Sequence, residues 1–411
     1  MPHWINNQIL GGAGASLRAQ LGMSAIRKKL GETDWLMWGL IIFLVGFLAA
    51  WSTRFHRDVL YFLVLAPFLL GATKGYWKEI WSVPSVKFLL IFFGYLLLSM
   101  AWSEDVEQGV LYDNIRYILM TLGFILAVAW VSAVHNEWLG KVLIVLAPVS
   151  LFVLIFSFFT YYGENDFPYS RLNNMVFYRD NPIAGSVGFV FVALLSLAAI
   201  LQHKNSVWRA LGWLGFLSAL VFLLLAQSRG LLLGVIVGGV ILLVCNKYWR
   251  VLGLVFVSCA AVIALVELTD GSRGFIERAD SGRFAIWAAT YERIAERPYF
   301  GEGLGTDYAI ERADGRTNIS PHNVFLMTAL IGGSVGLLLF FCLLASTVFL
   351  ANDRPRTSDS PAVLGLALLG GGLAMLSLNS HALVDTVNSH LWLGLWLPIG
   401  ILLGQGLKRF E

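Results

Sequence analysis

The chain has 411 residues, of which 57% are hydrophobic and only 13% are charged. Soluble domains carry about 25% charged residues, so this composition excludes a soluble globular, disordered or collagen-like protein and indicates a membrane protein. The net charge of +3 is too small to indicate a nucleic-acid partner. The three cysteines, Cys245, Cys259 and Cys342, lie inside apolar runs without metal-ligand spacing, so they predict neither a zinc site nor a disulfide framework.

Apolar runs that are long enough to cross a bilayer recur along the whole chain. A transmembrane helix needs about 20 apolar residues to cross a hydrocarbon core about 30 Å thick. We predict an all-α polytopic membrane protein with about twelve spans, or eleven if the short second one does not cross. The predicted spans are 35–51, 59–73, 86–101, 110–133, 139–160, 183–201, 207–226, 230–245, 251–268, 323–350, 362–379 and 388–407.

Basic residues predict the orientation of these spans, because cytoplasmic loops are enriched in Lys and Arg. The lysines of the short loops fall on alternate loops, on the same side as both termini. The region 17–30 reads as a basic juxtamembrane helix; a signal peptide is the alternative, but no cleavage site follows it. The predicted regions are a cytoplasmic segment 1–34, nine spans in 35–268, a periplasmic loop domain 269–322, three spans in 323–407 and a cytoplasmic end 408–411.

The face opposite the lysines carries arginines instead. Guanidinium groups bind phosphate bidentately and stay charged near a membrane, so this bias favours a phosphate-bearing ligand. The alternative is that these arginines form ordinary salt bridges with Asp and Glu of the loops. The arginines on this face are Arg54, Arg57, Arg116, Arg171, Arg179, Arg229, Arg273, Arg278, Arg283, Arg293, Arg297, Arg312 and Arg316.

The long loop contains an amphipathic segment, 283–297, which ends before Pro298 and is predicted to be a helix. Arg283 lies in its first turn, after candidate caps at 280–282. Unpaired backbone N–H groups and the helix dipole favour an anion at that position. We therefore predict that Arg283 completes a phosphate site; the alternative is that it pairs with Glu277 or with the aspartate of the capping run.

Arg229 lies in a very tight connection, 227–230, between two long apolar helices. It must therefore lie close to the hydrocarbon boundary. A guanidinium there costs a few kcal/mol, so such a residue usually faces the protein interior and a partner. The alternative is that its side chain snorkels to the interface.

His322 closes the long loop. Ser320 reads as the N-cap and Pro321 as the first residue of the following helix, which puts His322 in the first turn. A helix N-terminus and nearby arginines disfavour the imidazolium, so we expect His322 to be neutral and able to act as a general base. The alternative is a histidine that only forms hydrogen bonds at a helix end.

Other polar residues on the same face are weaker candidates. Asp385 shares the last outward loop with His381 and His390, and it could orient the candidate base or hold a hydroxyl. Arg179 follows the fifth span and Arg116 lies at the outward end of the fourth; both could extend an anion site. Exposed loop polarity explains these residues equally well.

Missing motifs narrow the function. The sequence has no P-loop, which speaks against an ATP-driven protein, and no metal-binding motif. The middles of the spans are almost free of ionisable residues, whereas ion-coupled transporters keep such groups at that depth. The polar residues gather at one membrane face, as expected of an enzyme that acts on the headgroup of a lipid-linked substrate.

Together, these features resemble the O-antigen ligase and polymerase superfamily. The resemblance covers about 35–407, and its sharpest motifs are 227–230, 281–287 and 321–326. It implies a bacterial inner-membrane glycosyltransferase that takes a glycan from undecaprenyl pyrophosphate at the periplasmic face. In this family, ligases pass the glycan to the lipid A core and polymerases pass it to another repeat unit.

The resemblance also implies roles for the candidate residues. Arg229 and Arg283 would neutralise charge on the leaving pyrophosphate, and His322 would take the proton of the acceptor hydroxyl, in one inverting step without ATP, metal or other cofactor. We favour the ligase because the sequence shows no additional soluble domain after the last span. The polymerase remains an alternative, as do a flippase for the same lipid-linked sugar and a structural scaffold.

Overall fold

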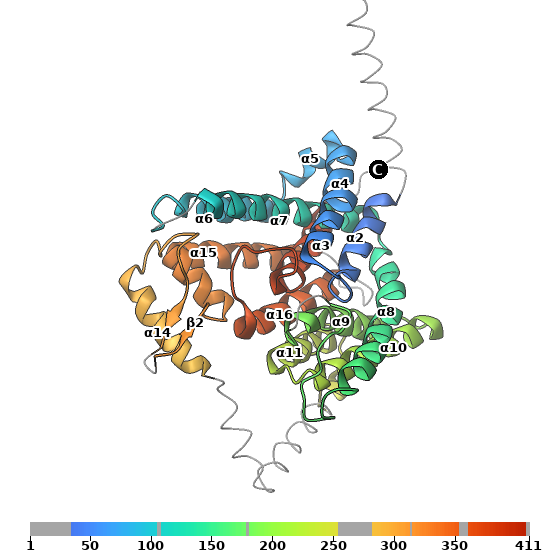
Figure 1. The fold of residues 1–411 in the computed structure, drawn as a ribbon. Helices are drawn as coiled ribbons and strands as arrows, with labels where there is room; N and C mark the ends of the chain where they lie inside the picture. Colours follow the sequence, from blue (N-terminus) through green and yellow to red (C-terminus); the bar gives the residue numbers. More distant parts are fainter. Residues whose placement is uncertain are drawn as a thin grey trace, which may run out of the picture.

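The computed structural model describes residues 34–104, 108–177, 181–253, 282–312, 315–352 and 361–407. Over these ranges the fold is helical apart from one antiparallel pair of short strands, in which Ile310 lies opposite Asn318 (Figure 1). The elements are α2 (Trp35–Val45), α3 (Thr53–Val59), η1 (Leu60–Leu65), α4 (Ala66–Gly71), α5 (Lys74–Ile80), α6 (Pro84–Ser99), α7 (Gln108–Val134), α8 (Trp138–Tyr162), η2 (Ala184–Ser186), α9 (Val187–Gln202), α10 (Ser206–Leu225), α11 (Arg229–Cys245), α14 (Arg283–Glu296), β1 (Ile310–Glu311), β2 (Thr317–Asn318), α15 (Val324–Asn352), α16 (Pro361–Asn379), η3 (Trp392–Trp396) and α17 (Leu397–Gly406).

Each predicted span within the described residues coincides with a helix or with consecutive helices. The ninth span, 251–268, lies outside them from residue 254 onwards, as does the basic segment 17–30. Within the described ranges, six helices are long and apolar enough to cross a membrane: α7, α8, η2 with α9, α10, α15 and α16. Four shorter apolar helices accompany them: α2, α6, α11 and η3 with α17. The chain is thus a polytopic helical membrane protein, and the count of twelve stays a prediction.

The predicted second span is not a single straight helix. The segment from Thr53 to Gly71 is followed by α5 at an angle of 96°, so the pair is either one broken span or a re-entrant loop. The break falls at Ala72 and Thr73, where the Thr73 hydroxyl accepts a hydrogen bond from the backbone N–H of Tyr76 and so caps a new helix. The predicted span ends at Thr73, so the helix α5, which carries Lys74, Lys78 and Glu79, lies beyond it.

Close packing of α11 against α16 determines where the polar ends of these helices lie. Glycines at every fourth position of α11 face α16: a Cβ at Gly234 would lie 2.9 Å from the Gly371 carbonyl oxygen, and one at Gly238 would lie 2.8 Å from that of Ala367. Small residues with this spacing let two membrane helices approach closely. The first glycine of the series, Gly230, meets Asn379 at the end of α16.

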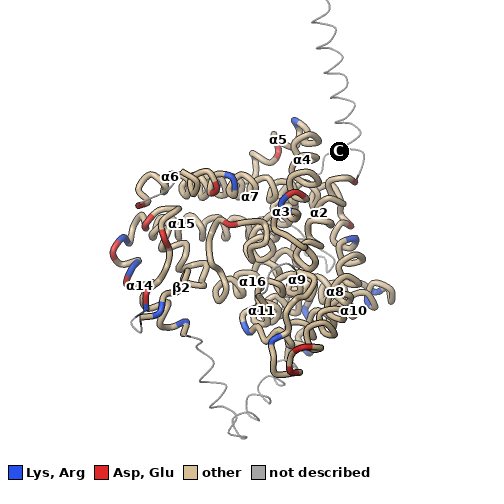
Figure 2. The backbone as a smooth tube through the Cα atoms, in the orientation of Figure 1, with Lys and Arg blue, Asp and Glu red and all other residues tan. Residues whose placement is uncertain are grey.

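Charged residues avoid the interior of the bundle. Figure 2 shows Lys, Arg, Asp and Glu mainly along α14, at helix ends and in connecting segments, while the middles of the long helices are almost free of them. Large apolar side chains fill the interior, including Trp138, Trp392 and Trp396, each at most 1% exposed. This distribution follows from the cost of placing a charge in hydrocarbon.

Candidate active site

The helix that carries Arg283 begins where the sequence predicts. Arg283 is the first residue of α14, and Gly282 precedes it with a φ of +72°, a left-handed conformation that glycine adopts without steric cost. The candidate caps Asp280 and Ser281 lie outside the described residues, as does the alternative partner Glu277. Ile286 and Thr290 are buried against the rest of the protein. The backbone N–H groups of the first turn of α14 are thus presented beside the Arg283 guanidinium.

The predicted cap before His322 is wrong. The side-chain oxygen of Asn323 accepts hydrogen bonds from the backbone N–H groups of Phe325 (2.8 Å) and Leu326 (3.1 Å), so Asn323 is the N-cap of α15. Asn323 displaces Ser320 from this role because its amide oxygen reaches two first-turn N–H groups at once. His322 therefore precedes the helix, and its φ of +55° lies in the left-handed region that is uncommon for non-glycine residues. Such backbone conformations cluster at functional sites.

The His322 ring packs edge-to-face against the His381 ring, with centroids 4.3 Å apart and an interplanar angle of 79°. Ser320 holds both residues: its Oγ is 3.2 Å from Nδ1 of His381 and accepts a hydrogen bond from the His322 backbone N–H at 3.4 Å. Burial, and then the neighbouring His381 and Arg283, lower the pKa of His322 to about 4. His322 is therefore neutral at pH 7, as predicted, although burial rather than nearby arginine is the leading cause.

Asn379 connects Arg283 to the start of α11, the helix that begins with Arg229. Nη2 of Arg283 donates to the side-chain oxygen of Asn379 at 3.5 Å. The Asn379 side-chain nitrogen donates to the Met375 carbonyl at 3.1 Å and lies so close to Gly230 that any Cβ there would clash with it. Arg229 is the neighbour of Gly230 in the first turn of α11, and its side chain is exposed. Arg283 and the start of α11, which carries Arg229, therefore lie at the end of α16.

A further contact joins α14 to the loop of His322. The indole Nε1 of Trp287 donates to the Pro321 carbonyl at 3.1 Å. As a result, the N-terminal ends of α11, α14 and α15 meet the C-terminal end of α16. Each helix N-terminus carries a partial positive charge. With the two guanidinium groups, this end of the bundle is suited to bind an anion next to a neutral imidazole.

Two other arginines form salt bridges, as the alternative interpretation predicts. Arg293 forms a two-pronged ion pair with Glu302, with N–O distances of 2.5 and 2.7 Å, and Arg297 pairs with Glu104. These pairs hold α14 against its own loop and against the segment before α7. Arg283 contacts the neutral side-chain amide of Asn379.

Of the weaker candidates, Arg116 and Asp385 have other partners in the described residues. Arg116 pairs with Asp113 at 2.9 Å and lies over the rings of Tyr112 and Tyr117, beside an apolar groove between η1, α4 and α7. Asp385 accepts a hydrogen bond from the Thr386 backbone N–H at 2.6 Å. Among the described residues no hydrogen bond links Asp385 to His322, whose ring neighbour is His381. Arg179 lies outside the described residues.

Sequence reasoning missed Asn379 and gave His381 little weight. A signal was present: the tripeptide Asn-Ser-His occurs twice in this region, at 379–381 and 388–390. In the second copy, Asn388 binds Nδ1 of the buried His56 at 2.8 Å, and the His390 ring lies 6.2 Å from that of His381. In each copy the Asn binds a residue that is distant in the sequence. The His of each copy belongs to the same group of neighbouring rings.

The described residues contain no group of three or more His, Cys, Asp or Glu side chains arranged to hold a metal ion. A small cavity of about 150 Å³ lies between the start of α7, the long loop, α15 and the segment that follows His381. Its walls include Asn114 of α7, Thr306 and Tyr308 of the long loop, Met327 of α15, and Ala382, the residue after His381.

Comparisons with known proteins agree with these observations. Residues 213–341 match the model of the O-Antigen ligase family, a region that contains Arg229, Arg283 and His322. An O-antigen ligase of Pseudomonas aeruginosa strain PAO1 is 25% identical over 367 residues, which cover 85% of this chain and 84% of that protein. A chain in the solved structure of a peptidoglycan synthase complex is 19% identical, with a TM-score of 0.48, over 80% of this chain and 98% of that one. Residues 213–341 thus match the O-antigen ligase family, and the resemblance to that family is confirmed.

Proposed function

We propose that this protein is a membrane glycosyltransferase of the O-antigen ligase type. It transfers a glycan from undecaprenyl pyrophosphate to a sugar hydroxyl of the lipid A core at the periplasmic face of the inner membrane. The observation that carries this proposal is the convergence at Asn379, which places Arg283 and the start of α11 next to the neutral His322.

Arg229 and Arg283 bind the pyrophosphate of the donor. As the bond between the anomeric carbon and the phosphate oxygen breaks, negative charge grows on the leaving undecaprenyl pyrophosphate. Guanidinium groups stabilise such charge bidentately, and the N-termini of α11 and α14 add to the positive potential. The pyrophosphate is already an activated leaving group, so the transfer needs no ATP. Because two arginines supply the positive charge, we expect transfer to proceed in EDTA.

His322 acts as the general base. Its neutral ring accepts the proton of the acceptor hydroxyl while the hydroxyl oxygen forms a bond to the anomeric carbon, and the configuration at that carbon inverts. The low pKa of His322 then favours release of the proton to solvent. A base of this kind typically contributes about 10²–10⁴-fold to the rate. We assign part of the acceptor to the cavity whose wall includes Ala382, the residue after His381.

The test is a transfer assay with the purified full-length protein in detergent. The protein receives undecaprenyl-pyrophosphate glycan and lipid A core, with EDTA and without ATP, and wild type is compared with His322→Ala. A matched control is His135→Ala, because His135 lies at the opposite end of the bundle beside Asp34. Product from wild type and the control, with little from His322→Ala, supports the proposal.

Other outcomes of this assay would point to a different function. Extension of the donor into longer chains without use of the lipid A core would identify a polymerase. If wild type consumes no donor under any of these conditions, transport of the lipid-linked sugar becomes the better hypothesis. Undiminished transfer by His322→Ala would leave the enzyme class in place and remove the assigned base.

A further inference from the structure

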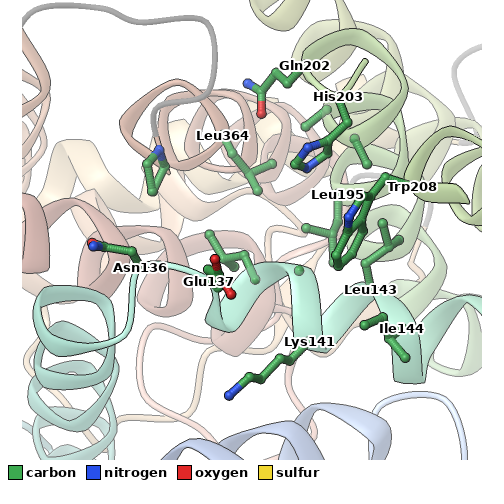
Figure 3. A pocket seen from close by; sticks show the side chains of 15 residues that line it. Asn136, Glu137, Lys141, Leu143, Ile144, Leu195, Gln202, His203, Trp208 and Leu364 are labelled. Carbon is green, nitrogen blue, oxygen red and sulfur yellow. The ribbon is translucent and has the colours of Figure 1, made fainter. Parts of the chain in front are cut away.

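A second cavity lies at the opposite end of the bundle. It has a volume of about 400 Å³ and lies between the start of α8, the end of α9 and the starts of α10 and α16 (Figure 3). Pro361, in its wall, begins α16, and Asn379 in the candidate active site ends the same helix. The 19 residues of α16 span about 28 Å at 1.5 Å per residue. A ligand of this cavity is therefore too far away to take part in the transfer reaction.

The deeper walls of the cavity are apolar. They include Leu143 of α8, Leu195 and Ala198 of α9 and Leu364 of α16. Ile144, also in the wall, is 46% exposed on the outer surface of α8, so the cavity opens sideways toward the lipid-facing surface. A cavity with this shape suits a hydrocarbon chain that continues into the bilayer.

The rim of the cavity is polar, and two of its groups have no partner among the residues that the structure describes. The side-chain nitrogen of Gln202 is buried and has no acceptor within the described part of the chain. A buried donor without an acceptor costs about 1–3 kcal/mol, so a ligand oxygen at this point would be stabilising. The Glu137 carboxylate likewise has no hydrogen bond or ion pair with any described residue, and it stands at the start of α8.

The lysine of the rim, Lys141, does not neutralise the negative charge of the Glu137 carboxylate. Nζ of Lys141 lies 3.4 Å from Asp34, which also pairs with His135 at 3.5 Å. Figure 3 shows the Lys141 side chain extending away from Glu137, Gln202 and His203. On the other side of the cavity, the His203 and Trp208 rings are stacked with centroids 5.3 Å apart. The rim thus offers a hydrogen-bond donor and an uncompensated negative charge above an apolar wall.

We propose that this cavity binds a glycerophospholipid with an ethanolamine headgroup, independently of the transfer reaction. The phosphate oxygen accepts a hydrogen bond from Gln202, the ammonium group lies near Glu137, and an acyl chain follows Leu143 and Ile144 outward. A lipid with a glycerol headgroup has the phosphate but no ammonium, so its net negative charge would meet the Glu137 carboxylate. The cavity is therefore expected to distinguish the two headgroups.

Native mass spectrometry of the delipidated full-length protein in detergent tests this proposal. The protein is titrated separately with palmitoyl-oleoyl phosphatidylethanolamine and phosphatidylglycerol. We expect one saturable site that prefers phosphatidylethanolamine by at least about threefold, the scale of an exposed charge pair. Gln202→Leu should weaken its binding by about tenfold or more, because a hydrogen bond to a charged phosphate is lost. Glu137→Gln should abolish the preference while leaving phosphatidylglycerol binding equal or stronger.

The control variant is Gln108→Leu, which makes the same substitution at an exposed position at the far end of α7. It should bind phosphatidylethanolamine as wild type does. Glycerophosphoethanolamine, which lacks acyl chains, should not compete. Equal affinity of wild type for both lipids, or wild-type affinity in Gln202→Leu, would overturn the proposal. Glu137→Gln changes an exposed residue and leaves the core intact, so it remains informative even if Gln202→Leu does not fold.

Discussion

The two ends of α16 use polar groups in opposite ways. At Asn379 the polar groups are bound to one another: Arg283, Met375 and the start of α11 all contact the one amide. At Pro361 the polar groups around the cavity, Gln202 and Glu137, find no such partner among the described residues. A site whose groups are held by the protein is pre-organised for chemistry. A site with unsatisfied groups obtains its stabilisation only when a ligand arrives.

The largest effect is expected at the pre-organised end. His322→Ala should reduce kcat for glycan transfer by about 10²–10⁴-fold with little change in KM, because the general base is lost while the binding groups remain. Initial rates at saturating donor and acceptor measure this change. A loss confined to KM would instead mean that His322 binds substrate without taking its proton.

The arginines should give the next largest effect. Arg229→Lys and Arg283→Lys keep the charge but remove the bidentate geometry, so we expect each to lower kcat/KM by about 10–100-fold, the scale of lost charge-assisted hydrogen bonds. Arg209→Lys, at the start of α10 and thus at the opposite end, serves as the matched control. If all three variants transfer glycan at the wild-type rate, phosphate binding at this site is not bidentate.

A third prediction concerns the contact that joins the two helices. Gly230→Ala places a Cβ against the Asn379 side chain, and overpacking of this kind costs about 1–3 kcal/mol. The melting temperature in detergent should fall, and activity should fall with it because Asn379 also holds Arg283. Gly94→Ala is the control, since a Cβ there meets nothing within 4 Å. An unchanged melting temperature for Gly230→Ala would mean that the ends of α11 and α16 are not in close contact.

The smallest effect is in the pH dependence. His322 must be neutral to act as a base, and its pKa is lowered to about 4. Activity should therefore persist through mildly acid pH and fall only as the pH approaches 4. His381 contributes to lowering this pKa, so His381→Gln should move the acid limb of the kcat profile to higher pH. An acid limb that stays in place in this variant would mean that burial and Arg283 alone determine the pKa.

Local sequence patterns predicted the helices well, because each apolar run is long enough to be read without knowledge of its neighbours. The starts of α11 and α14 at Arg229 and Arg283 follow from the same local rules. Prediction failed where two local signals competed: both Ser320 and Asn323 are good caps, and only the path of the loop decided for Asn323. It also did not predict the helix α5 after Gly71, since Lys74 and Lys78 indicated a cytoplasmic loop there.

The sequence by itself determined that this is a membrane protein, where most of its helices lie, and that arginines and a histidine gather near the ends of particular helices, because these properties depend on composition and on neighbours along the chain. The tertiary structure decided which of these residues meet. It joined Arg283 to Asn379 and His322 to His381, residues 96 and 59 positions apart. It also paired Arg116 with Asp113, its neighbour within α7. Helix packing made these choices, since the glycines of α11 determine how closely α16 approaches and therefore where its polar end lies.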